Sequence, residues 1–280
     1  MLEEQRFQAT SLVRLRRLVA FDRFLARLQQ VAPGRWRLKG GLALDYRLPV
    51  QFRTTRDLDI SRQDDEIATT EDFISAAALD LKDYFGFTVE RTLTTPPELD
   101  DRSARYHLTA SLAGRRFEAF SVDVSFTDPF FAAPDTVSAP ALLAFADVEP
   151  ISVPAIPVEQ HIAEKVHAYT RVYANQRPTS REKDLIDLVL VQGHIPVSAG
   201  RLIEALEVTF AVRNTHPLPT SMPVPPPTWG TAYARMATEV RVNRDPIDGY
   251  QAVSRLLDPV LARRLPHTAR WNPDTEEWEW

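Results

Sequence analysis

Apolar residues recur along the chain with two different periods, and these periods predict where helices and strands lie. A spacing of three or four residues near Phe7 to Val31, and again from Thr70 or Glu71 to Phe85, predicts two helices. Gly86 stands where a glycine commonly ends a helix. Short or alternating apolar runs predict strands, which we expect at Trp36 to Leu38, Asp57 to Ile60, Phe87 to Thr92, Tyr106 to Leu112 and Arg116 to Phe126.

The second half of the chain carries mainly the helical period, after a stretch with three prolines. That stretch, Asp147 to Pro157, is typical of a hinge or of a covering strand. Helices are expected at Val158 to Tyr173, from Pro178 onward, and at Ser198 to Phe210, Thr228 to Glu239 and Gly249 to Arg263. The patterns predict an α+β protein, with strands and helices in residues 1–155 and helices in residues 156–280.

Two carboxylates stand side by side in the second predicted strand. Side chains at positions i and i+2 of a strand point to the same face, so Asp57 and Asp59 share a face while Leu58 and Ile60 point into a core. Adjacent like charges need a compensating cation. Carboxylate oxygens with open positions suit Mg²⁺ held against substrate phosphates. Metal-dependent glycosyltransferases also use an Asp-x-Asp pair, so the pair alone leaves both classes of enzyme open.

A glycine pair precedes these carboxylates. Gly40-Gly41 lets backbone amides approach an anion at the start of a helix, where the helix dipole also favours negative charge. Lys39 and Arg56 are nearby cations that could contact the same anion. A turn that holds phosphate beside a metal-binding pair indicates a site for a nucleotide polyphosphate.

A third acidic residue, Asp123, lies between Val122 and Val124 in the second strand of the predicted hairpin. A buried carboxylate without a partner is costly. On an edge strand Asp123 would lie in water, whereas on a central strand it would need a partner. The apolar neighbours favour the central position.

Composition narrows the class of protein. The 280-residue chain has no cysteine, which excludes disulfides and thiolate sites, and its net charge of -5 argues against a general nucleic-acid coating protein. The chain has neither a signal-peptide pattern nor a long apolar run, so we expect a cytoplasmic protein that does not enter membranes. Two groups of basic residues are expected mainly on solvated helix faces, with a local basic groove as the alternative. They are Arg14, Arg16, Arg17, Arg23 and Arg27, and Arg171, Arg177, Arg181 and Lys183.

Five short segments, taken in order, resemble the AbiEii/AbiGii nucleotidyltransferase toxins, a group that includes the MenT-like toxins. The segments are Lys39-Gly40-Gly41, Arg56-Asp57-Leu58-Asp59, Val122-Asp123-Val124, Glu164-Lys165 and Lys183-Asp184-Leu185-Ile186-Asp187-Leu188. The resemblance implies a DNA polymerase β-like nucleotidyltransferase core in residues 1–155, with a mixed β-sheet flanked by helices. It also implies that a helical C-terminal domain, residues 156–280, completes the active site.

The resemblance also implies a role for each acidic residue and for one lysine. Asp57 and Asp59 would bind Mg²⁺, or Mn²⁺ in its place, and Asp123 would add a third ligand. Lys165 would contact the triphosphate, and Asp187 would orient Lys165 or contact the nucleotide. Asp184 lies closer to the start of its helix, where an acid suits the helix dipole, so we favour Asp187 over Asp184 for function.

Nucleotide binding is expected from a second set of residues beside the metal pair. One departure is that Leu42 stands where the superfamily usually has serine, so Thr54 or Thr55 would have to supply a hydroxyl. The expected nucleotide-binding residues are Lys39, Gly40, Gly41, Thr55 and Arg56.

The resemblance implies a Mg²⁺-dependent toxin of a toxin–antitoxin system. The expected reaction transfers a nucleoside monophosphate from an NTP to a tRNA 3′ end and releases pyrophosphate. We expect a monomer whose partners are an RNA acceptor and a cognate antitoxin. Two alternatives are a transferase acting on a small molecule such as an antibiotic, and a protein of the same fold that binds NTP or a partner without catalysis. The C-terminal tail, Trp271 to Trp280, could dock on a partner or on its own chain.

Overall fold

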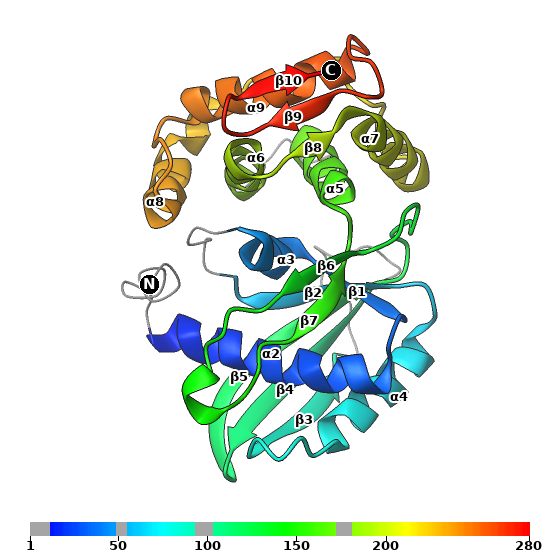
Figure 1. Cartoon of the computed structure of the whole chain (residues 1–280), viewed down its shortest axis with the longest axis vertical. Helices are drawn as coiled ribbons and strands as arrows, with labels where there is room; N and C mark the ends of the chain where they lie inside the picture. The colour runs from blue at the N-terminus through cyan, green and yellow to red at the C-terminus, as the bar shows by residue number, and fades with distance from the viewer. Residues whose placement is uncertain (1–11, 49–54, 93–102, 172–180) are drawn as a thin grey trace. The chain divides into compact units, whose positions relative to one another are not determined.

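A computed structural model describes residues 12–48, 55–92, 103–171 and 181–280 (Figure 1). The chain divides into two compact units, Met1–Ile156 and Pro157–Trp280, where the sequence had placed the boundary between residues 155 and 156. The predicted fold class is confirmed, since the first unit is a mixed sheet with helices and the second is mostly helical.

The described part of the first unit contains a seven-stranded sheet in the order β3-β4-β5-β2-β1-β7-β6. β2 runs parallel to β5 and β1 runs parallel to β7, while the other neighbours are antiparallel. β5 lies between β4 and β2, so the prediction of a central strand around Asp123 is confirmed. The strands are β1 (Trp36–Lys39), β2 (Asp57–Arg62), β3 (Phe85–Arg91), β4 (Ser103–Leu112), β5 (Arg115–Ser125), β6 (Asp135–Ser138) and β7 (Ser152–Ala155).

The proline-containing stretch before the second unit joins this sheet. Its residues Ser152–Ala155 form β7, which pairs with β1 on one side and with β6 on the other. A short 3-10 helix, η1 (Ala144–Ala146), lies between β6 and β7. Part of the stretch is therefore a strand within the sheet, between β1 and β6, and the sequence pattern missed β6.

One face of the sheet carries the core of the first unit. The helices are α2 (Leu12–Val31), α3 (Gly40–Arg47) and α4 (Glu66–Ala78). The rings of Phe21 and Phe24 on α2 pack edge-on against Phe120 and Phe73, and Phe73 packs against Tyr106 of β4. Leu58, Ile60, Val122 and Val124 are buried in the same core. Because side chains alternate along a strand, the residues between them point to the opposite face.

The predicted helix from Thr70 or Glu71 to Phe85 is wrong at both ends. α4 begins after Asp65, whose carboxylate accepts a hydrogen bond from the Ala68 amide, and it ends at Ala78. Phe85 and Gly86 belong to β3, so Gly86 is no helix cap.

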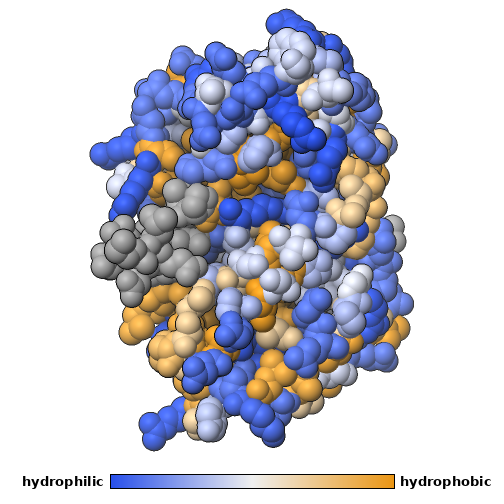
Figure 2. All heavy atoms as spheres, in the orientation of Figure 1, coloured by the Kyte–Doolittle hydropathy of each residue, from blue (hydrophilic) through white to orange (hydrophobic). Residues whose placement is uncertain are grey.

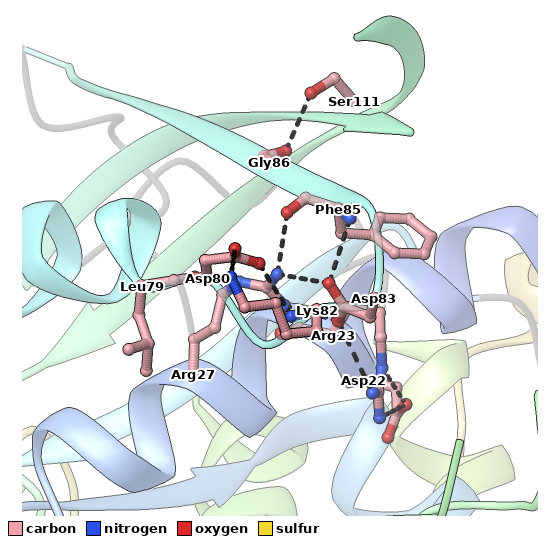
Figure 3. A network of polar contacts seen from close by, with 10 residues as sticks. All are labelled: Asp22, Arg23, Arg27, Leu79, Asp80, Lys82, Asp83, Phe85, Gly86 and Ser111. Atoms are coloured by element: carbon pink, nitrogen blue, oxygen red, sulfur yellow. Dashed lines mark hydrogen bonds and ion pairs between the residues drawn. The ribbon is translucent and has the colours of Figure 1, made fainter. Parts of the chain in front are cut away.

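A buried arginine explains why the helix stops early (Figure 3). The Arg27 side chain is fully buried, and it donates hydrogen bonds to the carbonyls of Leu79 at 3.0 Å and Phe85 at 2.8 Å. It also forms an ion pair with Asp83 at 2.6 Å. The segment between α4 and β3 thus folds around a guanidinium from α2, which no local spacing reveals.

The N-terminal arginines are not a solvated helix face. Arg14 pairs with Asp45 at 3.3 Å and Arg23 pairs with Asp83 at 3.7 Å, and all four side chains are buried or nearly so. Arg17 pairs with Glu118 at 3.3 Å. These arginines connect α2 to neighbouring elements of the unit, so they form neither of the two arrangements that the sequence favoured.

The second unit consists of helices and a small sheet. The helices are α5 (Val158–Thr170), α6 (Glu182–His194), α7 (Ala199–Arg213), the 3-10 helix η2 (Pro227–Trp229), α8 (Gly230–Val240) and α9 (Pro246–Leu261). In the described residues, β8 (Val197–Ser198), β9 (Arg270–Asn272) and β10 (Glu277–Glu279) form a sheet in the order β10-β9-β8.

The C-terminal tail docks on its own unit. The Trp271 indole donates a hydrogen bond to the Gln192 carbonyl at 2.8 Å, and the Trp278 indole donates one to the Leu256 carbonyl at 3.1 Å. The aromatic residues of the tail therefore cover α6 and α9, which settles an alternative that the sequence left open.

On the face shown in Figure 2, hydrophilic side chains predominate and apolar side chains lie between them. Within the described ranges, no helix is both long enough and apolar enough to span a membrane.

Candidate active site

The polar face of the sheet carries a row of charged side chains across four neighbouring strands. Asp59 on β2 lies beside Asp123 on β5 and beside Lys39 on β1, and Asp123 lies beside Arg105 on β4. Residues directly paired across strands share a face of the sheet. The row therefore reads Arg105, Asp123, Asp59, Lys39, with cations at the ends and carboxylates in the middle.

A second row lies two residues away on the same face. Asp57 of β2 lies beside Ser121 of β5, which lies beside His107 of β4. The Ser121 hydroxyl and His107 Nδ1 are 3.2 Å apart. Asp57 and Asp59 are both half-buried. This arrangement agrees with the expectation that the pair shares a face away from the core.

The turn between β1 and α3 approaches Asp59 closely. Gly40 has φ of +65°, and a β-carbon built on it would lie 2.0 Å from Asp59 Oδ2. Only glycine fits this position, because both the conformation and the space exclude a side chain. α3 starts at Gly40, and its N-cap Lys39 makes no side-chain capping bond. The glycine pair thus begins a helix beside the carboxylates, as the sequence predicted.

The other residues expected to bind nucleotide have varied surroundings. Lys39 Nζ forms an ion pair with Asp128, whose side chain is almost fully buried. The Thr55 hydroxyl donates a hydrogen bond to the Asp57 carbonyl at 3.1 Å, and Arg56 is exposed. Leu42 is fully buried in the core, which explains why an apolar side chain stands there. Thr54 lies outside the described residues.

Asp123 is held by a two-point ion pair. Arg105 Nε lies 2.6 Å from Asp123 Oδ1, and an Arg105 terminal nitrogen lies 2.7 Å from Oδ2. The Asp123 side chain is 11% exposed and that of Arg105 is 24% exposed. Such paired, charge-assisted hydrogen bonds are strong and fix the orientation of both groups.

The side chains of Asp57 and Asp59 suit a hard divalent cation, because carboxylate oxygens are the ligands that such ions prefer. Among the residues that the structure describes, no three acidic or histidine side chains are grouped so that they could hold one metal ion. The fit therefore concerns the pair alone.

The second unit brings Lys165 together with both candidate acids of α6. Lys165 Nζ on α5 lies 2.6 Å from Asp187 Oδ2 and 3.0 Å from Asp184 Oδ1. Asp187 is fully buried. Asp184 has a second basic partner, because its Oδ2 lies 3.5 Å from a terminal nitrogen of Arg181. The ion pair between Lys165 and Asp187 that the sequence offered as one alternative is present, but Asp184 shares it.

Sequence reasoning missed two charged partners of the site, Arg105 and Asp128. Arg105 lies between buried Ala104 and buried Tyr106, so the alternation along the strand predicts that its side chain points away from the core. The alternation does not predict that Arg105 lies opposite Asp123. Asp128 follows β5 in a segment without regular structure, and nothing in the local pattern connects it to Lys39.

Solved structures resemble this fold at low sequence identity. The nucleotidyltransferase toxin MenT4 from Mycobacterium tuberculosis superimposes with a TM-score of 0.53 and 17% identity, over 94% of this chain and 97% of that one. A protein from H. pylori whose crystal structure was solved as a candidate nucleotidyltransferase gives 0.50 and 13% identity, over 89% and 96%. No curated protein sequence matches the chain.

A family comparison covers most of the chain. Residues 23–259 match the model of the family described as the nucleotidyl transferase AbiEii toxin of a type IV toxin–antitoxin system. The matched span includes the glycine pair, the carboxylates of β2 and β5, and the Lys165 cluster. The chain therefore belongs to the AbiEii nucleotidyltransferase toxin family.

Proposed function

We propose that this toxin-type nucleotidyltransferase transfers a nucleoside monophosphate from an NTP to the 3′ end of a tRNA. The observation that carries the proposal is the pair Asp57 and Asp59 beside the glycine turn at the start of α3. Carboxylates that bind a divalent cation and amides that approach an anion are the two groups that a nucleoside triphosphate requires.

Each residue has a role in the proposed reaction. Asp57 and Asp59 would hold Mg²⁺, which when bound stabilises charge on the phosphates and favours ionisation of the attacking hydroxyl. The amides of Gly40 and Gly41 would contact phosphate oxygens. We propose that Lys165, oriented by Asp184 and Asp187, supplies positive charge to the triphosphate.

The reaction balances as a substitution at the α-phosphorus. The terminal hydroxyl oxygen of the tRNA attacks that phosphorus, and the bond to the oxygen that bridges to the β-phosphate breaks. Pyrophosphate leaves and the hydroxyl proton passes to solvent. The products are a tRNA longer by one nucleotide and free pyrophosphate.

A labelling experiment tests the proposal. The protein is incubated with each labelled NTP, Mg²⁺ and total tRNA, and the RNA and small-molecule fractions are separated. Label in tRNA supports the proposal. Label only in the small-molecule fraction would show that the acceptor is a small hydroxyl compound and not tRNA. NTP binding without any transfer would contradict catalysis.

Two variants show whether label depends on the metal pair. Asp59→Ala should abolish transfer while the protein stays folded by circular dichroism. Asp80→Asn, which changes an exposed acid after α4, should leave transfer unchanged and serves as the matched control. Full transfer by Asp59→Ala would overturn the metal-site assignment.

We also propose a cognate antitoxin as a partner, because the matched family is described as the toxin of a toxin–antitoxin system. Expression of the chain alone should stop bacterial growth, and co-expression of the gene beside it should restore growth. Asp59→Ala should be harmless without that gene. Equal toxicity of Asp59→Ala and the wild type would show that growth arrest does not depend on nucleotidyl transfer.

A further inference from the structure

We infer that His107 of β4 is a specificity-determining residue for the acceptor. Its imidazole stacks against the base of the terminal RNA nucleotide, and Ser121 holds the ring in place. The inference rests on the proposed function, because it concerns the acceptor of the same reaction. It assigns a role to the polar row on β4 and β5, which the proposed reaction leaves without one.

The first support is the side of the metal pair on which His107 lies. β2 lies between β1 and β5 in the sheet, and β4 follows β5. Gly40 comes directly after β1 and lies against Asp59 on one side of the pair. Ser121 lies beside Asp57 on the other side, and His107 is the next residue of that row. The glycine turn and the row on β4 and β5 therefore flank the carboxylates from opposite sides.

An in-line reaction requires the acceptor on the second of these sides. In such a substitution the attacking and leaving oxygens lie on opposite sides of the phosphorus. The leaving pyrophosphate belongs at the glycine turn, because the amides at the start of a helix suit an anion. The attacking hydroxyl, with the nucleotide that carries it, then comes from the side of β5 and β4.

The second support is the ring itself. His107 Nδ1 lies 3.2 Å from the Ser121 hydroxyl, and this hydrogen bond orients the imidazole. His107 is exposed, whereas Ser121 is half-buried. Two strand spacings put His107 about 10 Å from Asp57 along the row, so a nucleotide that reaches the metal with its hydroxyl has its base near the ring. Bases at unpaired RNA ends commonly stack on aromatic side chains, histidine among them.

The third support is the charge next to His107. Glu90 of β3 is exposed and pairs directly with His107, so the two share a face of the sheet. A carboxylate repels phosphate, but it can accept a hydrogen bond from the amino group of a base. The outer end of the row therefore suits the base of the terminal nucleotide and not its backbone.

Transfer of label by the full chain tests the inference, with the concentrations of tRNA and NTP varied separately. His107→Ala should raise the KM for tRNA about tenfold, as expected for loss of one stacked base, and should change the KM for the NTP by less than about twofold. His107→Phe keeps an aromatic ring, so its KM for tRNA should stay within about threefold of the wild-type value. His267→Ala changes an exposed histidine of the second unit and should leave both KM values unchanged.

A tRNA whose last nucleotide lacks its base gives a second measurement, which needs no protein variant. With the wild type, removal of the base should raise the KM for this tRNA about tenfold. With His107→Ala it should cause no further rise, because the stacking partner is already gone. A histidine with a purely structural role would not produce this dependence on the base.

Three results would overturn the inference. They are a wild-type KM for tRNA in His107→Ala, an equal loss in His107→Ala and His107→Phe, and an unchanged KM for the tRNA that lacks the terminal base. A rise in the KM for the NTP alone would overturn it too, because His107 would then contact the other substrate. Absence of label in tRNA with the wild type would contradict the proposed function itself, so the two failures are distinguishable.

Discussion

A β-carbon placed on Gly40 would lie 2.0 Å from the Oδ2 atom of Asp59, so the turn before α3 and the carboxylate of β2 occupy adjoining space. The backbone of Gly40 also has φ of +65°. Any other residue would strain the turn and displace the carboxylate. The position of Asp59 therefore depends on a residue that contributes no side chain.

Gly40→Ala should lower nucleotidyl transfer by about 100-fold, because displacements of about 1 Å in an active site have effects of that size. Gly34→Ala is the matched control, since Gly34 has φ of +75° but nothing within 4 Å of its β-carbon position. Both variants should lose about 1–2 kcal/mol of unfolding free energy from backbone strain, and Gly40→Ala should lose more. Equal transfer by the two variants would contradict the role of the close approach.

Lys165→Ala should lower the free energy of unfolding by about 3–5 kcal/mol, because it removes an ammonium that contacts two buried carboxylates. Adding Asp187→Asn to Lys165→Ala should restore part of that stability, since one of the two carboxylates becomes neutral. Transfer should stay lost in both proteins. Urea unfolding and the labelling assay together measure the two effects, and recovery of transfer in the double variant would exclude a catalytic role for Lys165.

Arg27→Met should also cost about 3–5 kcal/mol of unfolding free energy, because Asp83 and two carbonyls would lose a buried donor. Arg91→Met removes the exposed ion pair between Arg91 and Glu66, and it should lower the free energy of unfolding by less than about 1 kcal/mol. Chemical denaturation compares the two. Similar losses would show that burial does not decide the strength of these pairs.

His167 should make the second unit less stable in acid. Burial, and then the charges of Arg213, His216, Arg171 and Arg181, lower the pKa of its imidazole from 6.5 to about 3. The ring is buried and its Nε2 lies 2.8 Å from the Thr215 hydroxyl. Below pH 6.5 the unfolded chain binds a proton that the folded chain refuses, so stability falls as the pH drops from about 6.5 toward about 3.

The variant His167→Asn isolates this effect, since asparagine keeps a polar side chain but does not titrate in that range. The difference in unfolding free energy between wild type and variant should be constant above pH 7 and should shrink as the pH falls to 4. Urea unfolding followed by circular dichroism measures it. A constant difference at every pH would exclude His167 as the source.

The sequence alone determined the features that depend on neighbours in the chain. Alternation along β2 and β5 placed Leu58, Ile60, Val122 and Val124 in a core, and so placed Asp57 and Asp59 on the other face. The turn formed by the glycine pair at the start of α3 could also be predicted, because the conformation of a turn depends on neighbouring residues in the chain. The order of these motifs was enough to indicate the family.

Features that depend on distant residues were decided only by tertiary structure. The spacing of apolar residues extended the helix through Phe85, whereas Arg27 of α2 holds that segment in another conformation. The basic residues near the N-terminus suggested solvated faces, and their acidic partners lie on other elements. The residue pattern of one segment does not show which charged side chain of a distant segment will contact it.

The pairing of Arg105 with Asp123 shows the limit most clearly. Leu112 lies opposite Arg115 at the hairpin turn, and a simple count from there would place Arg105 opposite Val122, on the core side. A bulge between Ala110 and Ser111 shifts the register by one residue and places Arg105 opposite Asp123. Such a shift moves every side chain beyond it to the other face relative to its partner. The sequence determined which residues carry charge and which face each takes, but the register set by packing of the whole sheet decided which charges meet.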